Sequence, residues 1–147
     1  MWGTQKGGIR YGIVMQLTDN QALELWRRTI VAGVRHDVPD LSARQMAVLL
    51  TVYLKPPPHT VRGLASALQI SKPAITRSLD RLSDLGLLRR KIDESDRRSV
   101  LIQRTLRGSV FLREYGEIIV GSGYEMDDRP APIDAIPFEA AVSGGIA

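Results

Sequence analysis

The chain has 147 residues, of which 44% are apolar, and its formal net charge is +4, values that suit a single domain with an ordinary core. It contains no cysteine, which excludes a disulfide framework, a thiol nucleophile and a thiolate metal site. No apolar run approaches the ~20 residues that cross a bilayer, and residues 1–8 lack the apolar core of a signal peptide, so we expect no membrane partner and a cytoplasmic location.

Two helices are predicted before residue 60. Thr18 and Ser42 each begin a capping box, with a glutamine three residues later. Apolar residues at helical spacing after Thr18 predict a helix over 19–34. The helix that begins after Ser42 must end at the three prolines of 56–58, which we interpret as a stiff loop and not as a polyproline ligand.

Residues 60–85 predict two capped helices joined by a turn. The first begins at Thr60 and carries apolar residues on one face as far as Leu68. Ser71 offers a hydroxyl to the unpaired N–H groups of the next helix, and Pro73 lies in its first turn, where a missing donor costs nothing. The second helix of the pair therefore begins at Ser71.

The helix at 71–85 has one narrow apolar face, formed by Ile75, Leu79 and Leu82. Gly86 suits the left-handed position after a helix end, and Leu87 can pack back on the helix as in a Schellman motif. At ~1.5 Å per residue the helix is about 22 Å long, which fits the major groove of B-DNA.

Short strands are predicted at 87–92 and 100–105, and the polar segment 93–99 between them is too long for a two-residue turn, so it projects as a wing. A last helix is predicted over 106–120, where Gly121-Ser122-Gly123 interrupts the apolar pattern. The fold class is mainly α with a small β-wing (α+β), a winged helix-turn-helix with flanking N- and C-terminal helices. This fold makes double-stranded DNA the leading partner.

The charge distribution agrees with that partner. Residues 60–113 hold twelve Lys or Arg against five acids, a balance of +7 that attracts phosphate, although a basic surface could also serve solubility alone. Residues 125–147 hold five acids against one arginine, which predicts an acidic Pro-containing tail. Residues 1–17 are expected to form an N-terminal arm.

The order and spacing of five stretches resemble the MarR family of bacterial transcriptional regulators. The stretches are Leu41-Ser42-Ala43-Arg44-Gln45, Leu64-Ala65-Ser66-Ala67-Leu68, Ser71-Lys72-Pro73-Ala74-Ile75-Thr76-Arg77, Leu85-Gly86-Leu87 and Asp96-Arg97-Arg98-Ser99-Val100, followed by Thr105-Leu106-Arg107-Gly108. The resemblance implies a MarR-like domain at 18–124 with a DNA-binding core at 41–108. It also implies a homodimer on a pseudo-palindromic operator, with helix 71–85 in the major groove and wing 93–99 in the minor groove. It favours a repressor that a small-molecule effector can release.

Two features depart from the family pattern. Arg104 stands where the family usually has an apolar residue before the last helix, so we expect that strand end to be less buried or locally rearranged. The last helix is predicted to be short, whereas the family builds its dimer from long terminal helices. We nevertheless predict a homodimer held by 19–34 and 106–120, because two recognition helices must lie about one DNA turn, ~34 Å, apart to read a palindrome.

The resemblance implies contacts from the recognition helix and from the wing. Thr76 and Arg77 match the family's recognition-helix contacts, which can reach base edges or phosphates, and Asp96 with Arg98 matches a pair in which the aspartate orients the arginine toward the minor groove. A narrow minor groove also attracts a presented arginine electrostatically, although Asp96 could simply form a local salt bridge at a solvated loop. The residues expected to contact DNA are Ser71, Lys72, Thr76, Arg77, Arg81, Asp96, Arg97 and Arg98.

Alternatives remain for several side chains. Arg77 could pair on the helix surface with Asp80 or Asp84, and Lys72 and Arg81 are expected to meet phosphate and not bases. A set of large apolar residues could line a ligand cavity, although a plain core is favoured. That set is Trp26, Met46, Tyr53, Phe111 and Tyr115.

Enzyme chemistry is not expected. His36 and His59 are 23 positions apart, each beside loop residues and far from any paired cluster of acids that would complete a metal site or an acid–base pair, and no glycine-rich phosphate loop is present. We therefore predict no catalytic residues, no metal and no cofactor. The alternative to a DNA-binding regulator is a winged-helix module for protein–protein contacts with little or no DNA binding, in which the acidic tail covers or replaces the DNA surface.

Overall fold

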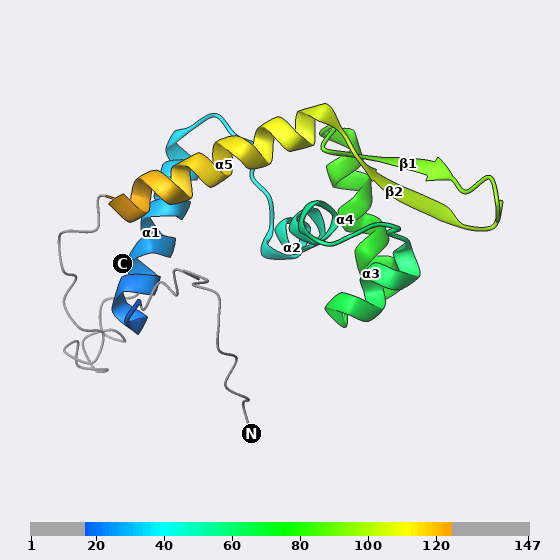
Figure 1. Cartoon of the computed structure of the whole chain (residues 1–147), viewed down its shortest axis with the longest axis horizontal. Coiled ribbons are helices and arrows are strands. Elements are labelled where there is room, and N and C mark those ends of the chain that lie inside the picture. Colours follow the sequence, from blue (N-terminus) through cyan, green and yellow to red (C-terminus); the bar gives the residue numbers. More distant parts are fainter. Residues whose placement is uncertain (1–16, 125–147) are drawn as a thin grey trace, which may run out of the picture.

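The computed structural model describes residues 17–124, which form five helices and one two-stranded hairpin (Figure 1). The predicted acidic tail, and all but Leu17 of the predicted arm, lie outside the described residues. None of the helices within 17–124 combines the length and the apolarity that a membrane span requires. In chain order the elements are α1 (Asp19–Arg35), α2 (Ala43–Leu54), α3 (Val61–Leu68), α4 (Lys72–Asp84), β1 (Leu88–Ile92), β2 (Val100–Arg104) and α5 (Leu106–Tyr124).

The predicted caps start the helices. Thr18 and Ser42 form complete capping boxes at α1 and α2. Thr60 accepts from the Gly63 N–H at 3.0 Å, and Ser71 accepts from the Ala74 N–H at 3.4 Å. These bonds satisfy N–H groups that have no partner inside the helix, so the helix starts follow from local sequence.

The core of the winged helix lies between α2, α4 and the base of the hairpin. The predicted face of α4 is fully buried, and it packs on α2 around a set of residues with no exposed surface: Val48, Leu49, Val52, Ile75, Leu79 and Leu82. Gly86 has a φ of 71°, and the Leu87 N–H donates to the Leu82 carbonyl at 2.9 Å. The predicted Schellman motif is therefore confirmed, and it turns the chain from α4 into β1.

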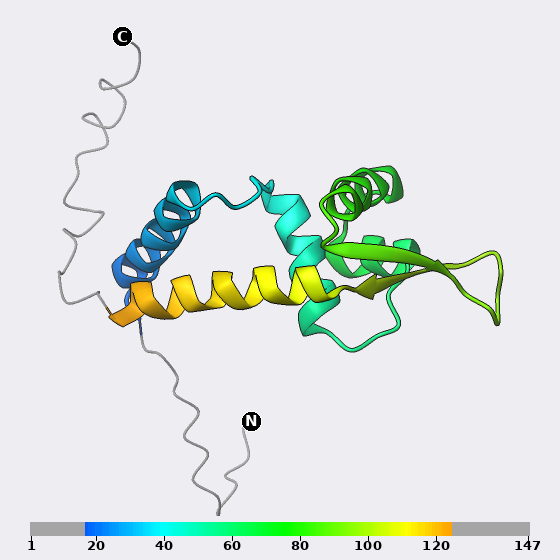
Figure 2. The ribbon, with the colours of Figure 1, turned by 90° about the horizontal axis from the view of Figure 1, so that it is seen from above.

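The hairpin is antiparallel, with Leu88 opposite Arg104 and Ile92 opposite Val100. β2 is also attached to the start of α3, because the Ile102 N–H donates to the His59 carbonyl at 2.8 Å and Thr60 forms a bridge with Leu101. The wing therefore extends from the body on a fixed base, as Figure 2 shows.

The predicted end of the last helix is wrong. α5 continues through the glycines to Tyr124 and has 19 residues, so it is not short. Its C-terminal half packs along α1, as both ribbon views show, where Ser122 is 8% exposed and Gly123 lies against Leu25 (Figures 1 and 2). This packing stabilises helical backbone that the local sequence does not favour.

Arg104 has a structural role at the junction of α2 and the wing. Its Nε donates to the Val52 carbonyl and a terminal nitrogen donates to the Lys55 carbonyl, both at 2.9 Å. These bonds satisfy carbonyls in the last turn of α2, and the guanidinium lies 5.8 Å from the centre of the Tyr53 ring. The strand end is exposed, as expected. The Arg104 side chain extends from it to the end of α2, which lies 49 or more residues away in sequence.

Candidate nucleic-acid interface

The two sides of α4 differ sharply in exposure. Its apolar side is buried, and its other side is exposed along the whole helix. The exposed residues are Lys72, Pro73, Thr76, Arg77, Asp80, Arg81 and Asp84. The predicted contact residues on this helix therefore share one solvent-facing side, while the opposite side anchors the helix in the core.

Near the start of α4, two predicted contact residues also make local bonds. Ser71 is the N-cap of α4, and its hydroxyl oxygen accepts a hydrogen bond from the Ala74 N–H, so this residue also has a structural role. The Thr76 hydroxyl donates to the Lys72 carbonyl at 3.0 Å. This bond fixes the threonine rotamer and uses its hydrogen, so only the oxygen lone pairs and the methyl group remain to meet a base.

An ion pair joins the recognition helix to the hairpin. Arg90 on β1 donates to Asp80 at 2.6 Å and to the Thr76 carbonyl at 3.2 Å. Both charged groups are substantially exposed, so the pair adds little stability, but it links α4 to β1. Local sequence gives no sign of this role for Arg90, since the contact joins residues on different elements.

This pair also bears on the alternative for Arg77. Asp80 is engaged by Arg90, and within residues 17–124 the structure records no ion pair for Arg77. Arg77 and Arg81 therefore extend from the exposed side of α4 as charges without an acidic partner among the described residues. Such side chains are available to a phosphate or a base edge.

Asp96 organises the wing through the backbone. One carboxylate oxygen accepts from the Arg98 N–H and the other from the Ser99 hydroxyl, both at 3.1 Å. The loop is closed by the Asp93 N–H, which donates to the Ser99 carbonyl at 3.0 Å. The carboxylate of Asp96 thus contacts the main chain of Arg98, and the structure records no bond between it and the Arg98 guanidinium. The side chains of Arg97 and Arg98 are exposed, and the orientation of Arg98 toward a minor groove stays a prediction.

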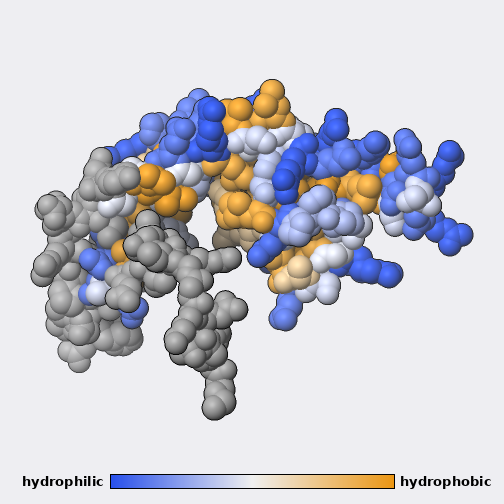
Figure 3. Space-filling view, in the orientation of Figure 1, coloured by the Kyte–Doolittle hydropathy of each residue, from blue (hydrophilic) through white to orange (hydrophobic). Residues whose placement is uncertain are grey.

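Asp93 makes a second turn at the same tip. Its carboxylate accepts from the Ser95 hydroxyl at 2.6 Å and from the Ser95 N–H at 2.9 Å. These bonds lower the pKa of Asp93 below its usual value, so it stays charged at neutral pH. Figure 3 shows the resulting wing as a strongly hydrophilic projection at one end of the molecule.

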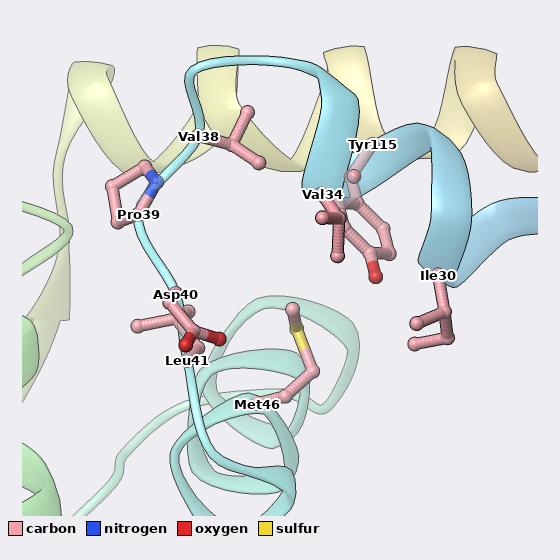
Figure 4. Close-up of a pocket in the computed structure, with 9 residues that line it drawn as sticks. Ile30, Val34, Val38, Pro39, Asp40, Leu41, Met46 and Tyr115 are labelled. Atoms are coloured by element: carbon pink, nitrogen blue, oxygen red, sulfur yellow. The ribbon is translucent and has the colours of Figure 1, made fainter.

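A separate apolar hollow of about 570 Å³ lies between α1, α2 and α5. Trp26, Met46 and Tyr115, three of the five residues considered for a cavity, line it. The other two belong to the core cluster: Tyr53 is packed against it and Phe111 is 7% exposed. A smaller neighbouring cavity of about 260 Å³ shares Met46 and Tyr115, and Asp40 is the one charged residue among those that line it (Figure 4).

The two histidines lie at helix ends. The His59 ring contacts the Lys55 carbonyl at 3.2 Å beyond the end of α2, and His36 follows α1 and is exposed. Within the described part of the chain, no three His, Cys, Asp or Glu residues gather in a way that could hold a metal ion.

Comparison with known proteins supports this description. A sequence model of the MarR family matches residues 40–99. Over 79 residues, 52% of this chain and 48% of the relative, the chain is 38% identical to the HTH-type transcriptional regulator PecS of Dickeya dadantii (strain 3937), so it aligns with about half of that protein's length.

Solved structures show the same fold. The S. aureus MepR–DNA complex has a TM-score of 0.58 at 22% identity, covering 68% of this chain and 79% of that one. The crystal structure of MarR has a TM-score of 0.55 at 24% identity, covering 69% and 73%. The family match covers α2 to the wing, and the fold matches winged-helix proteins of known structure. Residues 40–99 of this chain therefore match the MarR family in sequence, and the chain shares its fold with winged-helix proteins of known structure.

Proposed function

We propose that the protein is a sequence-specific regulator of transcription that binds double-stranded DNA as a homodimer. α4 enters the major groove, the wing at 93–99 reaches the flanking minor groove, and the two subunits read a pseudo-palindromic operator. In this proposal the protein acts in the cytoplasm as a repressor and catalyses no reaction; the match to the MarR family and the likeness to PecS, a transcriptional regulator, support its role in regulation.

One observation carries the proposal: the exposed side of α4 bears Lys72, Arg77 and Arg81, and of the two acids on that side, Asp80 and Asp84, the first is engaged by Arg90. A recognition helix needs a buried side that fixes it and an exposed side whose cations meet phosphates and base edges. The structural relatives include MepR solved in complex with DNA, which supports the same use of this fold. A protein–protein module would not require this excess of positive charge.

The wing supplies a test in which the direction of the change in DNA affinity distinguishes an ordered wing from diffuse charge. Asp96→Ala removes a negative charge, which simple electrostatics predicts to improve DNA binding. We expect it instead to weaken operator binding by about 1 kcal/mol, because the bonds to the Arg98 N–H and the Ser99 hydroxyl hold the wing tip. Fluorescence anisotropy with a labelled operator duplex measures the change.

Arg98→Ala is the partner variant. It should weaken binding most on operators with A·T-rich flanks and lower the salt slope by about one unit per subunit. Glu94→Ala is the matched control, since it removes an acid from the same exposed loop without breaking the Asp96 turn. Tighter binding by Asp96→Ala on every duplex would show that the wing acts only as diffuse charge.

The apolar hollow supports a small-molecule effector. Its volume of about 570 Å³ and its apolar lining from three helices suit a compact apolar ligand. Because Trp26 lines the hollow and only one other tryptophan, Trp2, is present, a bound ligand should change Trp26 fluorescence in a Trp2→Phe background. A ligand that releases DNA without this change would bind elsewhere.

A further inference from the structure

A basic cleft lies between the start of α3, the start of α4 and the wing. It has a volume of about 480 Å³, and its walls include Arg62, Lys72 and Arg98, one cation from each of these three elements. Arg62 is absent from the contact residues predicted above. The sequence shows it only as one of many cations in the basic region, because the cleft brings together residues that are 36 positions apart.

The single acid on the cleft is already occupied. Asp96 lines the cleft, but both of its carboxylate oxygens accept bonds from the wing loop, one from the Arg98 N–H and one from the Ser99 hydroxyl. Within residues 17–124 the structure records no ion pair for Arg62, Lys72 or Arg98. Three cations against one acid leave the cleft with a net charge of +2, so it attracts an anion.

The walls of the cleft are held together by the main chain. The Ile102 N–H donates to the His59 carbonyl at 2.8 Å, and Thr60 bridges to Leu101, so the wing strand and the start of α3 do not need to close on a ligand. Ser71 caps α4 just before Lys72 and fixes the third wall. A preformed backbone frame avoids the cost of ordering the main chain, so binding has to order only the exposed cationic side chains.

We propose that this cleft binds one phosphate group of the DNA backbone, with Arg62 and Lys72 as its direct cationic contacts, while the charge of Arg98, whose side chain reaches for the minor groove, adds to the positive potential of the cleft. The inference rests on the proposed function and adds a site to it: a phosphate of one DNA strand lies at the mouth of the cleft, next to the groove that α4 enters. Arg62 is then a positioning residue that sets the register of the protein on the duplex and does not read bases.

Salt dependence tests the site. Arg62→Ala should weaken binding to operator and random duplexes by the same factor. The slope of log affinity against log salt should fall by about 0.9 per subunit. Between about 50 and 200 mM salt, the Arg62→Ala dimer should therefore lose roughly tenfold less affinity than the wild-type dimer loses. Arg62→Lys should keep the slope. Arg44→Ala is the control, because Arg44 is an exposed cation in the first turn of α2, next to Ala43 at the apolar hollow. The inference is wrong if Arg62→Ala and Arg44→Ala have the same slope.

Neutral methylphosphonate linkages, placed one at a time in the duplex, locate the phosphate. At one position in each half-site, the neutral linkage should lower the affinity of wild type. At the same position it should not lower the affinity of Arg62→Ala below that of this variant for the unmodified duplex. Inorganic phosphate tests whether the ligand is free phosphate and not a phosphate of DNA. If it raises the melting temperature of wild type but not that of Arg62→Ala, and both proteins bind DNA with equal affinity, the cleft binds free phosphate and the inference is overturned. Failure of the wild type to bind any duplex would instead refute the proposed function.

Discussion

Gly108→Ala is expected to lower the free energy of unfolding by about 3 to 5 kcal/mol, more than the replacement of any exposed residue considered above. Gly108 is buried in the first turn of α5, and its N–H donates to the Thr105 hydroxyl at 3.0 Å. A Cβ at this position would overlap the Tyr53 hydroxyl and the Leu87 carbonyl, one of which is backbone and cannot yield.

The overlap would break a junction between three elements. The Tyr53 hydroxyl donates to the Leu87 carbonyl at 2.8 Å and accepts from the Thr105 N–H at 2.9 Å, so it joins α2, the turn between α4 and β1, and the start of α5. Displacing the ring leaves half-buried backbone groups without partners, which adds to the cost of overpacking.

Urea unfolding of Gly108→Ala measures the change, and Gly116→Ala is the control. Gly116 lies farther along the same helix, where a Cβ meets nothing within 4 Å, so this variant should gain up to about 1 kcal/mol from helix propensity. Equal stabilities for the two variants would show that α5 does not approach Tyr53 and Leu87 as described.

Breaking the homodimer is expected to have the largest effect on DNA binding. α1 carries a row of exposed apolar residues on one side, and α5 adds others that nothing within residues 17–124 covers. They are Leu23, Trp26, Ile30 and Val34 on α1, and Ile119 and Val120 on α5. The protein should therefore be a dimer at tens of micromolar by light scattering, with these helices at the interface.

The double variant Leu23→Glu/Val120→Glu should be monomeric. Its affinity for a two-half-site operator should fall by roughly 10²- to 10⁴-fold, because the second half-site is no longer bound at high effective concentration. The affinity for an isolated half-site should not change, since neither residue lies on the wing or the winged-helix core. Both side chains are 46% or more exposed, and neither lines the apolar cavities, so folding and the effector hollow should be preserved.

Arg113→Glu on α5 is the control for the double variant. It adds a negative charge without removing an apolar side chain, and it should remain dimeric. A monomeric wild type, free and on DNA, would contradict this interface.

Features set by local sequence were predictable. The caps at Thr18, Ser42, Thr60 and Ser71 and the stop at Gly86 all depend on residues within a few positions of each other, and each occurs as predicted. The apolar face of α4 was equally clear, since helical periodicity alone distinguishes its buried side from its exposed side.

Features set by contacts between distant segments were not predictable. The end of α5 depends on packing against α1. The glycines at 121 and 123 lower the local helix propensity, so the sequence alone predicts an earlier end. The roles of Arg104 and Arg90 depend on carbonyls and a carboxylate on other elements. The candidate site follows the same rule: its residues on α4 and the wing were predicted, but not the cleft that brings Arg62 to them.

The central claim is that α4 reads DNA sequence in the major groove, and the affinity ratio between a selected duplex and a scrambled one tests it most directly. Duplexes recovered by wild type from a random pool should bind at least ~10³-fold more tightly than scrambled duplexes at physiological salt, and they should contain two related half-sites. Arg77→Ala should cost about 1 to 3 kcal/mol on the selected duplex and relax preference at one position of each half-site, with less effect on the scrambled one. A ratio near one for wild type, or an Arg77→Ala loss that is equal on both duplexes, would contradict base reading by α4.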